Sequence, residues 1–241
     1  MNILCVIAAR GGSQGVPGKN VLPMLGQPLV ARAVHCARAA PEIGPVVISI
    51  DALAIADAGR AAGALVPFMR PASLAQSDSG KFQVWQHALA ASEAHFQTHF
   101  DLYVDIDCTN PLIEPSDVSG AITLFKSLRD NGVPVDAVFC VAPARRNPYF
   151  NLVEPAADGA LKMSKIQGDT VLSRQKAPPV FEHVAGVYVL DPAYLRRANH
   201  LLEGHARGYE VPESKALDVD SELDFQIIEF LLRQREAGAR T

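Results

Sequence analysis

The sequence of 241 residues lacks the features that mark membrane and nucleic-acid-binding proteins. No apolar run approaches the ~20 residues that cross a bilayer, and no basic and apolar leader precedes the first strand-like segment. The longest basic cluster is Arg145-Arg146 and the formal net charge is -4, whereas nucleic-acid binding requires a basic face. We therefore expect a cytoplasmic protein that binds neither membranes nor nucleic acids.

Cysteine is also scarce, with only Cys5, Cys36, Cys108 and Cys140. These residues form no C-x-x-C pair, so a structural zinc site is not expected. Cys5 and Cys140 lie in apolar runs and are predicted to be buried core residues. No cysteine has an evident histidine partner, which disfavours a Cys–His hydrolase.

Strand-like and helix-like segments alternate along most of the chain, which is the pattern of an α/β fold. We predict a Rossmann-like, mostly parallel sheet with helices on both faces, in a single domain of residues 1–241. The predicted strands are residues 2–9, 46–50, 65–69, 102–106, 137–141 and 184–190. The predicted helices are residues 28–40, 55–62, 81–94, 117–128 and 221–235.

Residues 143–182 break this alternation. They contain five prolines and an Asp158-Gly159 pair, which is typical of a hairpin turn. We interpret this stretch as an inserted arm rather than a second domain. The last predicted helix follows Ser221, which forms with Asp224 a variant of the capping box.

A glycine-rich loop follows the first predicted strand, at the end of the sheet where α/β proteins bind ligands. Its sequence, ARGGSQGVPGKN at residues 9–20, fits neither the Walker phosphate loop nor the GxGxxG fingerprint. Its glycines allow close backbone approach, its free N–H groups can form an anion nest, and Arg10 and Lys19 add positive charge. A phosphate-binding role is favoured over a flexible surface loop because the loop follows a buried strand.

Two pairs of alternating acids stand out. The residues alone favour a solvated loop for Asp218 and Asp220, leading to the N-cap at Ser221, where acids interact favourably with the helix dipole. Asp105 and Asp107 end an apolar strand, where two acids are costly unless they face a crevice or a cation. The alternative for that pair is a strand-end turn.

Six motifs in order, from residue 9 to residue 224, resemble those of the CMP-acylneuraminate synthetases (acylneuraminate cytidylyltransferases). Two of them, NPYFN at 147–151 and RQKAP at 174–178, are similar to the legionaminate-type branch. The other four are the loop at 9–20, RPASLA at 70–75, TNPL at 109–112 and DVDSELD at 218–224.

The resemblance implies that CMP is transferred from CTP to a small acidic acceptor, a nonulosonate such as an acylneuraminate or legionaminate, with Mg²⁺ and release of pyrophosphate. It implies a fold of the nucleotide-diphospho-sugar transferase type, catalytic roles for Arg10, Lys19 and Asp220, and metal binding by Asp218 and Asp220, whose carboxylates suit Mg²⁺ because that ion prefers oxygen ligands. Asp107 is a further candidate for metal or nucleotide binding because of its place at the end of an apolar strand. It also implies a homodimer in which residues 143–182 reach the partner. The nucleotide-binding candidates are Ala8, Ala9, Arg10, Gly11, Gly12, Ser13, Gly15, Lys19, Asn20, Asp51, Arg70, Lys81 and Asp107. The acceptor-binding candidates are Thr109, Asn110, Arg174, Gln175 and Tyr188, where Arg174 and Gln175 could instead serve the partner subunit or surface ion pairs.

Four positions depart from the family's pattern. Gln14 replaces a lysine, Asp107 a glutamine, Ile113 an arginine and Val184 an asparagine. Most of these departures lie at the acceptor end, so CTP is better supported than the sugar. Alternative acceptors are Kdo or a small phosphonate such as phosphonoformate. A non-catalytic nucleotide-binding module and a hydrolase on the same fold also remain open.

Overall fold

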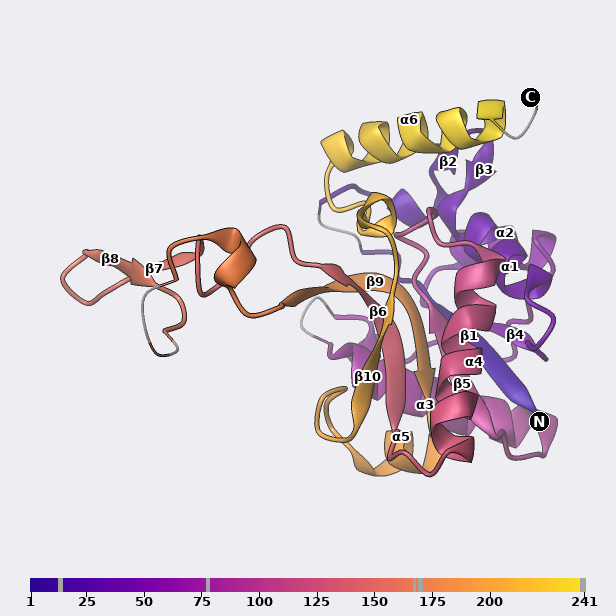
Figure 1. The fold of residues 1–241 in the computed structure, drawn as a ribbon. Coiled ribbons are helices and arrows are strands. Elements are labelled where there is room, and N and C mark those ends of the chain that lie inside the picture. Colours follow the sequence, from indigo (N-terminus) through magenta and orange to yellow (C-terminus); the bar gives the residue numbers. More distant parts are fainter. Residues whose placement is uncertain (13–14, 77–78, 167, 169–170, 239–241) are drawn as a thin grey trace.

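A computed structural model describes residues 1–12, 15–76, 79–166, 168 and 171–238 of the chain. Its centre is a six-stranded mixed sheet in the order β10-β6-β9-β5-β1-β4, shown in Figure 1. Only β9 runs antiparallel to its neighbours, so the predicted mostly parallel sheet is confirmed. The sheet strands are β1 (Ile3–Ala8), β4 (Val46–Ser49), β5 (Leu102–Ile106), β6 (Ala137–Pro143), β9 (Phe181–Leu190) and β10 (Ala206–Glu210).

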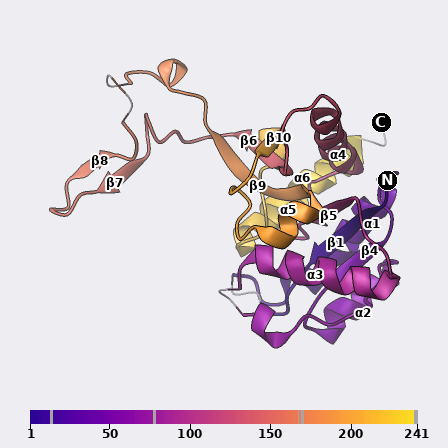
Figure 2. The ribbon, with the colours of Figure 1, turned by 90° about the horizontal axis from the view of Figure 1, so that it is seen from below.

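Helices cover both faces of the sheet because successive side chains of a strand point to opposite faces. Ile3, Cys5 and Ile7 of β1 pack with α1, α2 and α4, whereas Leu4 and Val6 pack with α3 and α5. Figure 2 shows these layers from below. The helices are α1 (Leu29–Ala39), α2 (Leu53–Ala61), α3 (Lys81–Phe96), α4 (Pro115–Asp130), α5 (Pro192–Arg197) and α6 (Glu222–Gly238).

The predicted strand at 65–69 is wrong. Only Leu65 forms a bridge, to Val47, and the chain then turns toward Arg70. The strand β10 and the helix α5 were not predicted from the sequence. β10 reads ARGYE and its residues are at most half-buried, so it carries no apolar run. α5 has only six residues, too few to show a helical period.

Residues between β6 and β9 extend away from the body as an arm, which Figures 1 and 2 both show. Near its end, β7 (Val153–Pro155) pairs antiparallel with β8 (Leu161–Met163). The turn contains the expected Asp-Gly pair: Gly159 has a φ of 84°, and the backbone N–H of Ala160 donates to Asp158 Oδ1 at 3.0 Å. This hairpin could be predicted because its turn depends on two adjacent residues.

A small separate core attaches α6 to the body. Ile228 and Leu232 of α6 pack with Met24, in the short hairpin of β2 (Pro23–Met24) and β3 (Gln27–Pro28), and with the buried Val219. The predicted capping box is confirmed, because Ser221 N donates to Asp224 Oδ2 and Asp224 N donates to Ser221 Oγ. These contacts fix the chain on both sides of Asp220.

A buried ion-pair cluster fixes the same segment further upstream. Lys215 ends a short 3-10 helix (Glu213–Lys215), and its ammonium donates to Asp117 Oδ2 and Glu114 Oε2, each at 2.6 Å. Its carbonyl accepts from Asn110 Nδ2 at 2.8 Å. Asp117 and Glu114 raise the pKa of Lys215, although its burial opposes this. The cluster joins the start of α4 to the approach to Asp218.

We expect Lys215→Met to lower the free energy of unfolding by about 3 kcal/mol, because it leaves the buried Asp117 carboxylate without its cation. The measurement is chemical denaturation. Arg60→Met is the control, since the Arg60–Asp57 pair lies on the surface of α2, where such pairs contribute ~1 kcal/mol or less. Equal effects of the two substitutions would contradict the structural role of Lys215.

Candidate active site

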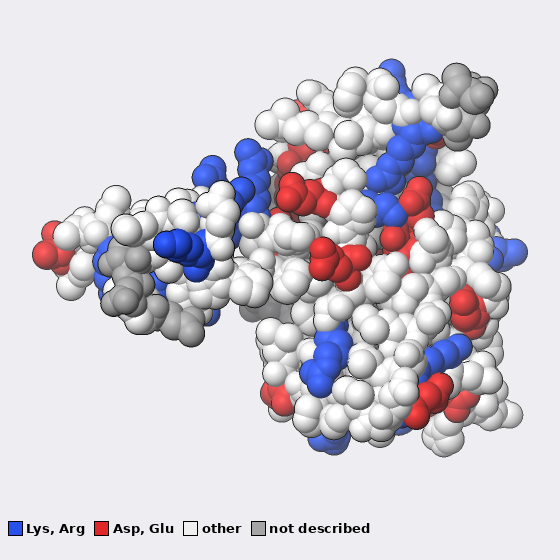
Figure 3. Space-filling view, viewed as in Figure 1, with Lys and Arg blue, Asp and Glu red and all other residues white. Residues whose placement is uncertain are grey.

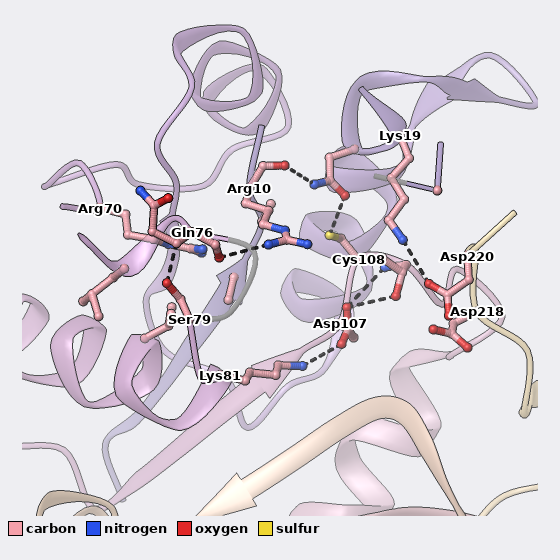
Figure 4. A pocket seen from close by; sticks show the side chains of 17 residues that line it. Arg10, Lys19, Arg70, Gln76, Ser79, Lys81, Asp107, Cys108, Asp218 and Asp220 are labelled. Carbon is pink, nitrogen blue, oxygen red and sulfur yellow. Dashed lines mark hydrogen bonds and ion pairs between the residues drawn. The ribbon is translucent and has the colours of Figure 1, made fainter. Parts of the chain in front are cut away.

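A cleft lies beyond the carboxyl ends of β1 and β5, at the edge of the sheet where the sequence predicts ligand binding. It encloses about 500 Å³, and Figure 4 shows its side chains. The predicted residues that line it are Ala8, Ala9, Arg10, Gly15, Lys19, Asn20, Arg70, Lys81, Asp107, Thr109, Asp218 and Asp220. Sequence reasoning missed Leu74, Gln76, Ser79, Val84 and Cys108, which belong to no charge or glycine pattern.

The glycine-rich loop is braced from inside by Asn20. The Asn20 side chain is buried; its amide donates to the carbonyl of Arg10 at 2.8 Å, and its oxygen accepts from Cys108 Sγ at 3.1 Å. Arg10 Nη1 donates to the carbonyl of Gln76 at 3.0 Å, across the mouth of the cleft. The loop therefore brings Arg10 to the cleft with donors still available to an anion. Ser13 and Gln14 lie outside the described residues.

Lys19 lies opposite Arg10 in the cleft, and its ammonium contacts the acidic segment. Its Nζ donates to the carbonyl of Val219 and lies 3.3 Å from Asp220 Oδ1. Val219 is itself held because its N–H donates to the carbonyl of Thr109 at 2.8 Å. Residues some 200 positions apart in the chain thus form one wall of the cleft.

Gly15 allows the loop to approach this wall. A Cβ atom at Gly15 would lie 2.0 Å from the carbonyl oxygen of Asp220. Such an overlap can be relieved only by moving the loop or the acidic segment. The glycine is therefore required by contact between two backbones.

We expect Gly15→Ala to reduce kcat/KM at least tenfold, since it displaces Asp220 from Lys19, where a small misplacement in a catalytic site is costly. The measurement is steady-state turnover. Gly12→Ala is the comparison, because a Cβ there meets no atom within 4 Å, and we expect a smaller effect. A Gly15→Ala variant as active as Gly12→Ala would show that the close approach is dispensable.

Asp218 and Asp220 face the cleft beside Lys19. Burial raises the pKa of Asp218, and the negative charges of Asp220 and Asp107 raise it further. Bringing acids together in this way is costly unless a cation binds there. No three Asp, Glu, His or Cys side chains within the described residues already form a metal-binding group. The Asp218–Asp220 pair nevertheless fits a hard cation that also takes oxygen ligands from a substrate.

Lys81, the first residue of α3, lies between two carboxylates on the cleft floor. Its Nζ donates to Asp107 Oδ2 at 2.6 Å and is 3.1 Å from Asp105 Oδ2. Lys81 lowers the pKa of Asp107, although burial opposes this. Asp107 also accepts from Thr109 Oγ1 at 3.1 Å. Lys81 therefore already has two anionic neighbours and adds little net positive charge for a phosphate.

Two other predicted nucleotide-binding residues play visible structural roles. Arg70 is buried at the cleft wall and donates to the carbonyl of Ser49 at 2.6 Å and to its hydroxyl at 3.2 Å. Asp51 lies outside the cleft lining, and its carboxylate accepts from the N–H of Gly11 at 2.9 Å. Gly11 and Gly12 also lie outside that lining. Asp51 thus holds the start of the loop, which is a shaping role.

The five acceptor-binding candidates are not brought together in one chain. Thr109 lines the cleft. Asn110 is buried; its amide nitrogen donates to the carbonyl of Lys215, and its amide oxygen accepts from the N–H of Leu112. Tyr188 is also buried, its ring 4.3 Å from Lys81 Nζ and its hydroxyl 3.0 Å from His183 Nε2. The side chains of Asn110 and Tyr188 thus pack inside the body and already have hydrogen-bond partners there, while acceptor binding by them stays a prediction.

Arg174 and Gln175 lie on the arm, in a 3-10 helix (Arg174–Lys176) away from the cleft of their own chain. The four departures from the family's pattern also differ in their surroundings. Ile113 and Val184 are buried in the main core, so they serve packing. Asp107 is held by Lys81, and Gln14 lies outside the described residues.

Comparisons with known proteins agree with this geometry. Residues 4–203 match the cytidylyltransferase family. The chain is 37% identical to the CMP-N,N'-diacetyllegionaminic acid synthase of Campylobacter jejuni, over 95% of this chain and 94% of that protein. It is 34% identical to the post-translational flagellin modification protein B of Campylobacter coli, over 99% and 98%. The structure of a CMP:2-keto-3-deoxy-manno-octonic acid synthetase complexed with CTP shares the fold, with a TM-score of 0.71, 19% identity and coverage of 98% and 100%.

Proposed function

The chain belongs to the cytidylyltransferase family, as its motifs indicated, and on that premise we propose that it transfers CMP from CTP to a nonulosonate of the legionaminate or acylneuraminate type. It is a CTP-dependent nucleotidyltransferase. The identity to a named CMP-N,N'-diacetyllegionaminic acid synthase over nearly the whole chain favours the legionaminate type as acceptor.

The observation that carries the proposal is the arrangement of charges around the cleft. Arg10 and Lys19 present positive charge from the glycine-rich loop, and Asp218 and Asp220 present negative charge beside them, as Figure 4 shows. A triphosphate with a bound cation matches both sets of charges.

In the proposed reaction, an acceptor hydroxyl attacks the α-phosphorus of CTP. A P–O bond to the acceptor forms, the bond to pyrophosphate breaks, and the hydroxyl proton is released to water. Arg10 and Lys19 hold the phosphate oxygens and neutralise the charge that shifts to the leaving group. Asn20 and Asp51 fix the loop that carries these groups. Catalysis then depends on positioning and charge, and no covalent nucleophile is needed.

We propose Mg²⁺ as the cofactor, held by Asp218 and Asp220. Asp107, the third predicted ligand, already accepts hydrogen bonds from Lys81 and Thr109, so we do not assign it to the metal. When bound, the ion would neutralise phosphate charge and orient the triphosphate. We expect Mg²⁺ with CTP to raise the melting temperature of the wild-type protein more than CTP alone, because a ligand that binds the native state stabilises it.

We also propose a homodimer formed through the arm. The arm exposes Leu161 and Leu172, 70% and 83% accessible, at a distance from the body core. Figure 3 shows basic side chains where the arm meets the body. Four basic residues of the arm are exposed: Arg145, Arg146, Arg174 and Lys176. Because Arg174 does not line the cleft of its own chain, we propose that it contacts an acidic acceptor in the cleft of a second copy.

The dimer is tested by light scattering after gel filtration. We expect a dimer for the wild type and a larger monomer fraction for Leu161→Glu/Leu172→Glu. A strictly monomeric wild-type protein that is fully active would contradict the proposed role of the arm.

The acceptor is tested by pyrophosphate release with Mg²⁺, comparing CTP, UTP, ATP and GTP with N,N'-diacetyllegionaminate, N-acetylneuraminate, Kdo and phosphonoformate. We expect release only with CTP, and fastest with the legionaminate-type acceptor. Preference for Kdo or phosphonoformate would overturn the acceptor. Release without any acceptor would indicate a hydrolase.

No helix of the described residues is long and apolar enough to cross a membrane.

A further inference from the structure

Asp105 is a fully buried carboxylate whose hydrogen bonding is incomplete. Its relative accessibility is 0%, no hydrogen bond of good geometry reaches its oxygens among the described residues, and its nearest donors are the Lys81 ammonium and the Trp85 indole. Lys81 Nζ lies 3.1 Å from Oδ2, close enough for an ion pair. Burial of a charged group that is incompletely paired is costly, and buried polar groups are nearly always hydrogen-bonded. The position therefore calls for a reason other than stability.

The Lys81 ammonium is shared between two carboxylates of unequal accessibility. It donates to Asp107, which lines the cleft, and faces Asp105, which lies behind it. The rings of Tyr188 and Trp85 enclose the ammonium, with centroids 4.3 Å and 5.3 Å from Nζ. Without Asp105, a Lys81 ammonium that moved away from Asp107 would have only aromatic rings beside it and no carboxylate partner.

Asp107 is fully engaged in this structure. Oδ2 accepts from Lys81, and Oδ1 accepts from the hydroxyl of Thr109. A bound molecule that offers a hydroxyl to Asp107 must compete with these donors. The competition is easiest against Lys81, because Asp105 can take the ammonium after a small movement.

We propose that Asp105 is a positioning residue: it accepts the Lys81 ammonium when a hydroxyl of the bound acceptor binds Asp107. The inference rests on the proposed function, since it assumes an acceptor in the cleft. Asp105 touches no substrate in this account. It acts through Lys81 by making Asp107 available at little electrostatic cost.

The test compares Asp105→Asn, Lys81→Met and the double variant with the wild type. We expect Asp105→Asn to bind CTP within about twofold of the wild type, while KM for N,N'-diacetyllegionaminate rises about tenfold, the scale of one hydrogen bond to a charged group. A purely structural role would move both parameters through loss of folded protein, which melting curves detect. Since Asp105 acts through Lys81, the double variant should be no worse than Lys81→Met alone.

Losses that add in the double variant, or an Asp105→Asn enzyme with wild-type acceptor KM, would overturn the inference. If Asp105→Asn does not fold, the wild-type crystal structure with a non-hydrolysable CTP analogue and N,N'-diacetyllegionaminate decides. We expect Lys81 Nζ to hydrogen-bond Asp105 and an acceptor hydroxyl to bind Asp107. An ammonium still bound to Asp107 would overturn the inference, whereas a wild type without transfer activity would overturn the proposed function as well.

Discussion

Lys19→Ala is expected to abolish turnover, with kcat/KM reduced about 10²-fold to 10³-fold, the loss that follows removal of one preorganised donor to a developing charge. The Lys19 side chain is only 14% exposed and points into the cleft beside Asp220. The other lysine that lines the described cleft, Lys81, is paired with Asp105 and Asp107 and cannot replace the charge of Lys19. CTP binding should weaken in parallel, because the triphosphate loses a cation.

The measurement is pyrophosphate release together with CTP titration calorimetry. Lys126→Ala on α4 is the matched control, since it removes a lysine from a helix remote from the cleft. The melting temperature of Lys19→Ala should stay near that of the wild type, because the Lys19–Asp220 pair has an exposed partner and contributes ~1 kcal/mol or less. Near-wild-type turnover by Lys19→Ala would remove Lys19 from the catalytic residues.

Asp220→Ala is expected to reduce kcat by about 10²-fold or more, with smaller change in CTP affinity in the absence of metal. The Asp220 side chain is 75% exposed and its main partner is Lys19, so its removal leaves the fold intact. The loss should come from weaker cation binding beside the triphosphate. It should therefore be accompanied by a higher Mg²⁺ concentration for half-maximal rate.

Glu222→Ala is the control for this substitution, because Glu222 is an exposed acid two residues away at the start of α6. It should show the wild-type Mg²⁺ dependence. An Asp220→Ala enzyme with unchanged rate and unchanged Mg²⁺ dependence would contradict the assignment of Asp220. It would also favour the interpretation of the acids as helix-end residues only.

The sequence predicted the charged framework of the site because that framework depends on local motifs at strand ends. The loop at 9–20 follows from its glycines, its charge and its place after a buried strand, where α/β proteins bind ligands. The role of the acids at 218–220 came from the family resemblance, since the residues alone favoured a solvated loop before the helix. The contacts between these segments could not be predicted from the sequence. That Gly15 contacts Asp220, or that Lys215 joins α4 to the acidic segment, depends on contacts between residues far apart in sequence.

The same limit explains why two residues predicted to contact the acceptor are buried in the body. Asn110 and Tyr188 lie in motifs near the cleft, but motif position does not tell which face of the backbone a side chain occupies. Strand pairing places Tyr188 opposite Asp105 in β5, and Tyr188 packs on the face of the sheet that α3 and α5 cover. The sequence indicates that burying the Asp105 carboxylate costs free energy. Only the structure shows that Lys81 is its neighbour and that, of Asp105 and Asp107, only Asp107 lines the cleft.

The most direct test of the central claim is to identify the product formed from CTP and N,N'-diacetyllegionaminate by the wild-type protein with Mg²⁺. Mass spectrometry and phosphorus NMR should show a CMP ester of the acceptor together with an equal amount of pyrophosphate. Release of pyrophosphate with free CMP as the only nucleotide product, or CTP binding without any product, would contradict the assignment of this chain as a transferase for that acceptor.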